Sequence, residues 1–116
     1  MGYGVDDIWY LAPGRAMHLD RAGRPLTLRR FGELVGDPTY KILRTTEVRA
    51  CTVITAWLGT DQGSGLDAEP PRIFGTIVKA DGAFLDGSER FAATEAEALA
   101  NHATACAAVT GADWRG

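Results

Sequence analysis

Apolar residues recur at helical spacing over residues 28–35 and predict a short helix in the first half of the chain. Thr27 stands directly before this segment, and its hydroxyl can cap the helix by accepting from a backbone N–H. Gly36 is expected to end the helix in a left-handed conformation, and Asp37-Pro38 to prevent its continuation. The apolar stripe of this helix comprises Leu28, Phe31, Leu34 and Val35.

A second helix is predicted near the end of the chain, and its start is clearer. Thr94 and Glu97 form a capping box, in which each side chain accepts a hydrogen bond from the other residue's backbone N–H. Gly111 is expected to end this helix. The stripe predicted to face inward comprises Leu99, His102, Ala103, Cys106 and Val109.

Between these helices, residues 40–46 and 48–58 predict an antiparallel pair of strands, because they are rich in β-branched and aromatic residues. Both faces of the second segment are largely apolar, whereas a strand with one solvated face would alternate more cleanly. We therefore expect 48–58 to be a central strand whose second face is covered by a helix or by another copy of the chain. Its two faces are Val53, Thr55 and Trp57, and Thr52, Ile54, Ala56 and Leu58.

Further extended stretches complete the predicted sheet. Residues 72–79 form a strand that turns at Asp81-Gly82 into a shorter stretch over 83–91. Residues 1–18 are expected to form an N-terminal arm or edge strand, and 112–116 a tail. The whole chain is thus predicted to be a single domain of the α+β class: an antiparallel sheet of about four to five strands with two helices, in the order β-α-β-β-β-(β)-α.

Composition limits the class of protein further. The chain has 116 residues, of which 46% are hydrophobic and 23% charged, as expected for one globular domain. No apolar run approaches the roughly 20 residues that a membrane span needs, and the N-terminal sequence MGYGVDD does not resemble a secretory leader. We therefore expect a cytoplasmic protein without a membrane partner. Cys51 and Cys106 lie far apart in the sequence and are expected to be reduced, buried apolar residues, with a disulfide or a reactive thiol as the alternative.

The charge distribution disfavours nucleic acid as a partner but leaves room for a local anion site. The net charge is −3, whereas a dedicated DNA-binding domain normally presents a basic face. Residues 1–49 contain eight Arg or Lys and six Asp or Glu, whereas residues 50–116 contain four and nine. An arginine-rich half can form an anion pocket even in an acidic protein.

Enzyme motifs are absent from the sequence. It contains no GxSxG nucleophile elbow, no HExxH zinc motif and no phosphate-binding loop with Lys followed by Ser or Thr. We therefore expect no catalytic residue, cofactor or bound metal, and an enzyme is less favoured than a binding protein. Of the two histidines, His18 is expected to be exposed, and His102 to be a core or subunit-contact residue or, alternatively, part of a pocket.

A candidate ligand site lies where the central strand ends. Trp57 is followed by Gly59 and by polar residues, and an aromatic ring at the mouth of a pocket could stack on a flat ligand. A core tryptophan followed by an ordinary turn is the alternative. Arg72 and Arg90 could each bind a phosphate or carboxylate through a guanidinium fork, or else be solvated charges. The candidate ligand-binding residues are Thr55, Trp57, Asp61, Arg72, Thr76, Arg90 and His102.

Three stretches together resemble a small uncharacterised protein family of actinobacteria and their phages. They are residues 52–61 (TVITAWLGTD), residues 70–76 (PPRIFGT) and residues 90–102 (RFAATEAEALANH). Gly75 and Gln62 depart from the family pattern, because family members are often acidic at the first position and carry His at the second. The resemblance implies no activity, and these departures favour binding over catalysis.

Two functions follow from these observations as hypotheses. The first is a module that binds a small anionic or nucleotide-like ligand; in the phage context of the resemblance, it would sequester a nucleotide-derived signal of host immunity. Trp57 would then stack on the base, and Arg72 and Arg90 would hold phosphate or ribose. The second is a protein-interaction module that inhibits or docks on a host protein through the glycine-rich loop at 59–71 or a sheet edge. The small size of the domain and its apolar central strand also predict a homo-oligomer.

Overall fold

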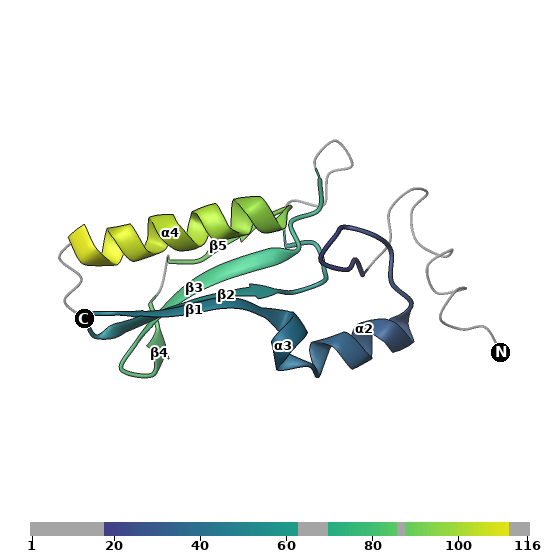
Figure 1. The fold of residues 1–116 in the computed structure, drawn as a ribbon, viewed down its shortest axis with the longest axis horizontal. Helices are drawn as coiled ribbons and strands as arrows, with labels where there is room; N and C mark the ends of the chain where they lie inside the picture. The colour runs from purple at the N-terminus through teal and green to yellow at the C-terminus, as the bar shows by residue number, and fades with distance from the viewer. Residues whose placement is uncertain (1–17, 63–69, 86–87, 112–116) are drawn as a thin grey trace.

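The computed structural model describes residues 18–62, 70–85 and 88–111 (Figure 1). The predictions about the N-terminal arm before residue 18, the inside of the glycine-rich loop and the C-terminal tail lie outside these residues. Within them, the chain forms an antiparallel sheet with helices packed on it and beside it, which confirms the predicted α+β class.

Three long strands form the body of the sheet. β1 (Ile42–Val48), β2 (Cys51–Trp57) and β3 (Phe74–Ala80) pair antiparallel in that order. Two short strands, β4 (Ala83–Phe84) and β5 (Arg90–Ala92), pair with opposite ends of β3. β2 is therefore central, as its composition predicts, whereas the single stretch predicted after the turn is divided into two strands.

The turns depend on residues with positive φ. Asp81 and Gly82 have φ values of 53° and 80°, the combination of a type I′ hairpin turn, and they join β3 to β4 as predicted. Near the start of the described chain, residues 19–25 form a small hairpin-like loop closed by a bridge between its ends, with Gly23 at a φ of 85°. This hairpin loop brings its polar residues to the end of the sheet.

α4 (Glu95–Gly111) lies lengthwise across one face of the sheet (Figure 1). The Thr94 hydroxyl caps it by accepting from the Glu97 N–H at 3.1 Å, as predicted. The Glu97 carboxylate accepts from the Ala93 N–H at 3.1 Å rather than from Thr94, so only half of the predicted capping box is present.

The stripe of α4 that faces the sheet differs from the predicted one. Leu99 and Cys106 are only partly buried, and Ala103 is exposed. Small side chains let the helix backbone approach the sheet closely, so the contact centres on alanines and the larger leucine lies at its margin. The buried residues of α4 are Ala98, His102, Ala105 and Val109.

The two faces of β2 differ in exposure. Its residues that point to α4 are buried, whereas those that point away are half-buried. No helix crosses this second face among the residues that the structure describes (Figure 1). The prediction that both faces are covered is therefore confirmed on one face only. We call the side of β1, β2 and β3 that points away from α4 the open face; on β2 and β3 it consists of Thr52, Ile54, Ala56, Gly75, Ile77 and Lys79.

α2 (Leu28–Val35) lies beyond one end of the sheet (Figure 1). The Thr27 hydroxyl caps it by accepting a hydrogen bond from the Arg30 backbone N–H at 3.1 Å, as predicted. The predicted apolar stripe holds only in part, because Leu28 and Val35 are 53% and 37% exposed. Gly36 has a φ of −83°, so the predicted left-handed end is wrong.

α3 (Pro38–Lys41) follows directly and was predicted neither as a helix nor as a turn. The Asp37 side chain accepts from the Thr39 N–H at 3.1 Å, and Pro38 occupies the first helical position, where its missing N–H costs nothing. Asp37-Pro38 therefore ends one helix and begins another. Tyr40, predicted as the start of a strand, is consequently helical.

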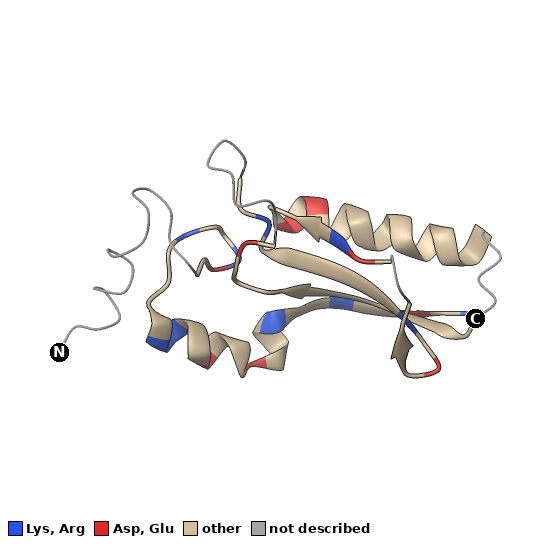
Figure 2. Cartoon of the chain, turned by 180° about the vertical axis from the view of Figure 1, so that it is seen from behind, with Lys and Arg blue, Asp and Glu red and all other residues tan. Residues whose placement is uncertain are grey.

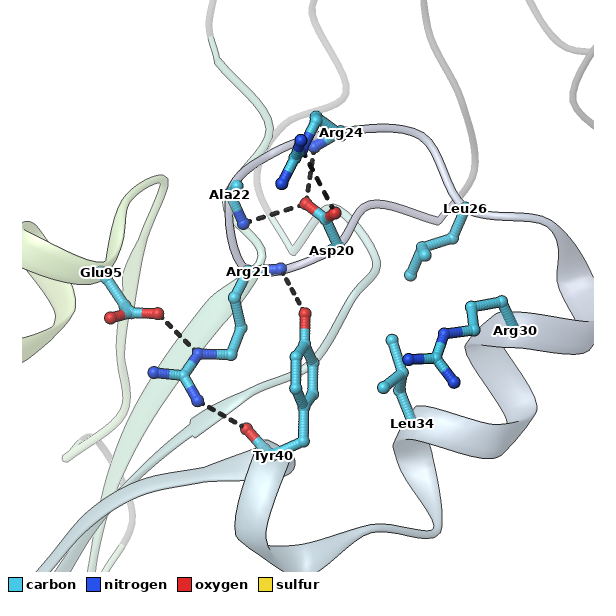
Figure 3. A pocket seen from close by; sticks show the side chains of 9 residues that line it. All are labelled: Asp20, Arg21, Ala22, Arg24, Leu26, Arg30, Leu34, Tyr40 and Glu95. Atoms are coloured by element: carbon cyan, nitrogen blue, oxygen red, sulfur yellow. Dashed lines mark hydrogen bonds and ion pairs between the residues drawn. The ribbon is translucent and has the colours of Figure 1, made fainter.

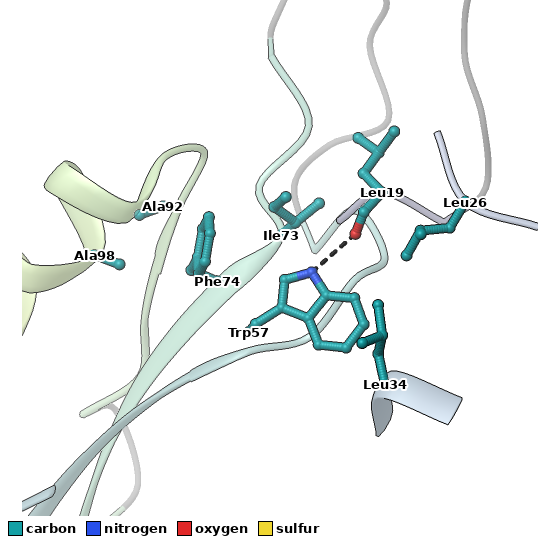
Figure 4. Packing of buried hydrophobic residues seen from close by; sticks show 8 residues of the cluster. All are labelled: Leu19, Leu26, Leu34, Trp57, Ile73, Phe74, Ala92 and Ala98. Carbon is teal, nitrogen blue, oxygen red and sulfur yellow. Dashed lines mark hydrogen bonds between the residues drawn. The ribbon is translucent and has the colours of Figure 1, made fainter. Parts of the chain in front are cut away.

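The hydrophobic core consists of two clusters. The larger one surrounds Trp57 at the end of the sheet nearest α2 and α3 (Figure 4). The smaller one, centred on Val53 and Val78, lies under the C-terminal half of α4. The larger cluster comprises Leu19, Leu26, Leu34, Trp57, Ile73, Phe74, Ala92 and Ala98.

Candidate functional site

Three of the predicted site residues, Thr55, Thr76 and His102, lie together between α4 and the sheet and are at most 2% exposed. The Thr55 hydroxyl lies 2.6 Å from the Thr76 hydroxyl and 2.8 Å from His102 Nδ1. His102 Nε2 lies 2.8 Å from the Thr46 hydroxyl. Both ring nitrogens therefore have a hydroxyl partner, and this buried polar cluster joins α4 to all three long strands. His102 is a core residue rather than the wall of an open pocket.

Burial lowers the pKa of His102 below its usual value, because the imidazolium form would lose its hydration. The positive charge of Arg44 lowers the pKa further. Arg44 pairs with Thr55 between β1 and β2, which places the two residues on the same face of the sheet. The neutral imidazole suits its two hydroxyl partners, since one nitrogen donates while the other accepts.

We expect acidification to destabilise the protein through His102. The unfolded chain takes up a proton at its ordinary pKa of about 6.5, whereas the folded chain resists protonation, so on acidification the unfolded state gains the proton first. The stabilisation is therefore complete above about pH 6.5 and falls below it, by up to about 1.4 kcal/mol per pH unit for one histidine. Urea denaturation at a series of pH values between about 7.5 and 5 measures this slope.

Two variants separate the contributions of the histidines. His102→Leu should remove its share of the slope and cost about 1–3 kcal/mol at neutral pH, because the Thr46 hydroxyl loses its partner. His18 is partly buried, so the prediction that it is exposed is wrong. Its ring stacks on Phe31 with the ring centroids 3.8 Å apart, and desolvation lowers the pKa of His18 also. His18→Leu should remove the separate contribution of His18 to the pH dependence of the free energy of unfolding. An unchanged slope in His102→Leu would contradict the assignment.

Trp57 does not form a platform at the mouth of a pocket. Its side chain is 0% exposed, and its Nε1–H donates to the Leu19 carbonyl at 2.8 Å (Figure 4). The rings of Phe31 and Tyr40 pack around it, with centroids 5.7 and 5.1 Å from the indole. No ring face is left for a ligand, so the stacking role does not fit the position of Trp57. The position of Trp57 fits the alternative, a core tryptophan followed by a turn.

The remaining predicted site residues lie at the surface. The Asp61 carboxylate accepts from the Arg72 N–H at 2.9 Å. Arg72 borders a shallow hollow of about 460 Å³ beside Phe91, which is 39% exposed. Arg90 is exposed on β5, opposite Thr76 of β3. The predicted ligand residues are thus divided among the buried polar cluster, the hydrophobic core around Trp57 and the surface.

A hollow that the sequence did not single out lies between the hairpin loop, α2, α3 and the start of α4 (Figure 3). Its volume is about 560 Å³, and the arginines at its wall come from two separate elements. We call it the arginine groove. It is lined by Asp20, Arg21, Ala22, Arg24, Leu26, Arg30, Leu34, Tyr40 and Glu95.

Arg21 is held in place by contacts along the whole residue. Its Nε donates to Glu95 Oε2 at 2.5 Å, and its Nη1 donates to the Tyr40 carbonyl at 3.0 Å (Figure 3). Its backbone N–H donates to the Tyr40 hydroxyl at 2.8 Å, and its guanidinium lies 5.4 Å from the centre of that ring. The hydrogen bond with Glu95 raises the pKa of Arg21 above its usual value.

Arg24 and Arg30 are the exposed cations of the arginine groove. The Arg24 side chain is 79% exposed, and its Nε lies 3.6 Å from the Asp20 carboxylate. The Arg30 side chain is 58% exposed, and its Nη1 lies 2.9 Å from the Glu33 carboxylate. Exposed ion pairs contribute only about 0.2–1 kcal/mol, so both guanidinium groups can change partner at little cost. Leu26 and Leu34, on either side of Arg30 in Figure 3, are the apolar residues with large side chains that line the groove.

The basic excess of residues 1–49 is the sequence signal that corresponds to this groove. Figure 2 shows Lys and Arg on the hairpin loop, α2 and α3, all at the same end of the molecule. The contact between Arg21 and Glu95, however, joins residues 74 positions apart. No local pattern indicates such a contact, whereas the strand ends at Arg72 and Arg90 are visible in the sequence.

Comparison with known proteins found no match. No protein-family model, no curated protein and no solved structure is significantly similar to the chain. Among the residues that the structure describes, no group of three or more His, Cys, Asp or Glu is placed to hold a metal ion. None of the described helices is long and apolar enough to cross a membrane.

Proposed function

We propose that the protein binds a small anionic ligand in the arginine groove. The observation that carries this proposal is that Arg21, Arg24 and Arg30 line one hollow together with only two carboxylates, those of Asp20 and Glu95. A guanidinium group presents its donors in a planar fork that matches the oxygen atoms of a phosphate or carboxylate. The residues that line the groove thus carry one more positive than negative charge, in a protein whose net charge is −3.

The arginines have different roles in this proposal. Glu95 and Tyr40 hold Arg21 in one orientation, so little conformational freedom is lost there when a ligand binds. Arg24 and Arg30 are solvated and close on the anionic groups of the ligand.

The apolar residues of the groove narrow the class of ligand. Leu26 and Leu34 can contact a non-polar part of the ligand, as in most small-molecule sites. A nucleotide-like molecule carries both an anionic group and a flat ring, so it complements this lining better than an inorganic ion does.

The narrower hypothesis concerns the biological role of such a ligand. A phage-encoded protein could sequester a nucleotide-derived signal of host immunity, and the resemblance to a family of actinobacteria and their phages is what favours this context. Sequestration requires tight binding without turnover. A ligand bound in this way raises the stability of the folded protein by mass action.

Reversal of the two exposed cations should abolish tight binding. ADP-ribose, a cyclic dinucleotide and inorganic phosphate serve as probes, and at least one of the two nucleotide-derived probes should raise the melting temperature. Arg24→Glu and Arg30→Glu each replace an attraction by a repulsion and should weaken the binding of that probe by about tenfold or more. Isothermal titration calorimetry measures the dissociation constants.

Arg29→Glu is the matched control for these reversals. Arg29 lies on α2 next to Arg30 and is exposed, but it does not line the groove. This variant changes the net charge equally and should bind the probe almost as well as the wild type. Binding that is equally weak in the control, or a failure of every probe to bind, would overturn the proposal. Phosphate binding alone would restrict it to inorganic anions.

A further inference from the structure

We propose that the open face of the sheet packs against the open face of a second copy of this chain, around a two-fold axis along β2. This inference goes beyond the ligand-binding function and does not depend on it, because the arginine groove is formed by other residues. α3 and β4 bound the open face at its two ends, while α4 covers the opposite side of the sheet (Figure 1).

The centre of the open face is apolar. Ile54 of β2 pairs with Ile77 of β3, and both point away from α4, because the residues on either side of them in each strand are buried beneath it. The side chains of Leu58 and Phe91 lie over Gly75 and extend this surface toward β5. A sheet face of this kind is normally covered by a second layer about 10 Å away.

Charge is arranged symmetrically about β2 on the same face. Thr52 pairs with Glu47 of β1 on one side and with Lys79 of β3 on the other. Paired residues share a face, and neighbouring strands lie about 4.8 Å apart, so the acid and the base flank the central strand at equal distances. Opposite charges in equivalent positions about one line are the pattern that a self-complementary interface requires.

A rotation of 180° about an axis parallel to β2 exchanges the positions of β1 and β3 and preserves the height along the strands. Glu47 of each copy then lies opposite Lys79 of the other, so the contact forms twice, and Ile54 meets its own equivalent near the axis. A two-fold axis across the strands would instead place β1 of one copy over β1 of the other. Glu47 of one copy would then lie toward the Ile42 end of β1 in the other copy, away from Lys79. The charge pattern therefore selects the axis along β2.

A second copy fits this pattern better than an unrelated protein does. An unrelated partner needs complementary charge on its own surface, but it does not require Glu47 and Lys79 to be equivalent about β2. In an isologous dimer, that equivalence brings both residues into contact with opposite charge.

Charge reversal and mixing of variants test the proposal on the full chain. Light scattering over a range of micromolar concentrations should show a dimer. Glu47→Lys and Lys79→Glu each place like charges opposite one another twice and should raise the dissociation constant by at least about tenfold. When the two single variants are mixed, both contacts are again between opposite charges, so a heterodimer of nearly wild-type affinity should form. Native mass spectrometry distinguishes the heterodimer from the homodimers.

Each outcome of this experiment is decisive. Recovery on mixing supports the proposal and cannot come from contacts within one chain, because each chain still carries two like charges. A monomeric wild type, a dimer that neither reversal weakens, or single variants that do not recover on mixing would overturn it. Arg29→Glu controls for net charge and should leave the dimer unchanged. If a reversal lowers the melting temperature, Glu47→Gln and Lys79→Gln test the same contact more mildly, and each should still weaken the dimer.

Discussion

Replacing Trp57 with alanine should lower the free energy of unfolding by about 3–5 kcal/mol, a large share of the about 5–15 kcal/mol that stabilises an ordinary domain. The side chain is 0% exposed and packs against rings from α2 and α3, so its removal opens a cavity between these helices and the sheet. The substitution also removes the Nε1–H that donates to the Leu19 carbonyl. Equilibrium urea denaturation measures the loss.

Two further variants separate the causes of this loss. Trp57→Phe keeps most of the buried volume but removes the donor, and it should cost about 1–2 kcal/mol. Leu28→Ala truncates a side chain that is 53% exposed and should change the free energy of unfolding by less than about 0.5 kcal/mol. If Trp57→Ala cost no more than Leu28→Ala, Trp57 could not be the centre of the larger core cluster.

Local features of the fold could be predicted from the sequence. The hydroxyl of Thr27, the Asp81-Gly82 turn and the β-branched composition of β2 each depend on residues close together in the chain. Their physical causes, namely an unpaired backbone N–H, a positive φ and a pleated packing surface, act over a few residues. The structure confirms all three.

Features that depend on distant contacts could not be predicted in the same way. The helical spacing of apolar residues placed Leu99 on the inner stripe of α4, whereas the structure buries Ala98, whose small side chain allows close contact between helix and sheet. Hydropathy also indicated that both faces of β2 are covered, although α4 covers only one. The number of layers over a sheet depends on the whole chain and its partners, and the apolar pattern of one strand does not determine it.

The candidate site shows the same division. Thr55, Thr76 and His102 were predicted only as members of a larger set of ligand residues, and the structure places them together as a buried, hydrogen-bonded cluster. The proposed role of Trp57 failed, since an aromatic residue at the end of a strand has the same local pattern whether helices pack over it or not. The arginine groove depends on Glu95 reaching Arg21 from the other half of the chain.

Gly59→Ala should cost about 2–5 kcal/mol, through backbone strain and overpacking together. Gly59 has a φ of 79°, and a Cβ at this position would lie 2.5 Å from Phe31 Cε1 and 2.7 Å from Trp57 Cζ2. These rings are in a close-packed cluster and have little room to move. Gly82→Ala is the matched control, because Gly82 has nearly the same φ, 80°, but no atom within 4 Å of its added Cβ, so it should cost only the strain of about 1–2 kcal/mol. The difference between the two losses measures how firmly the Trp57 cluster is packed against Gly59, and equal losses would mean that the rings give way.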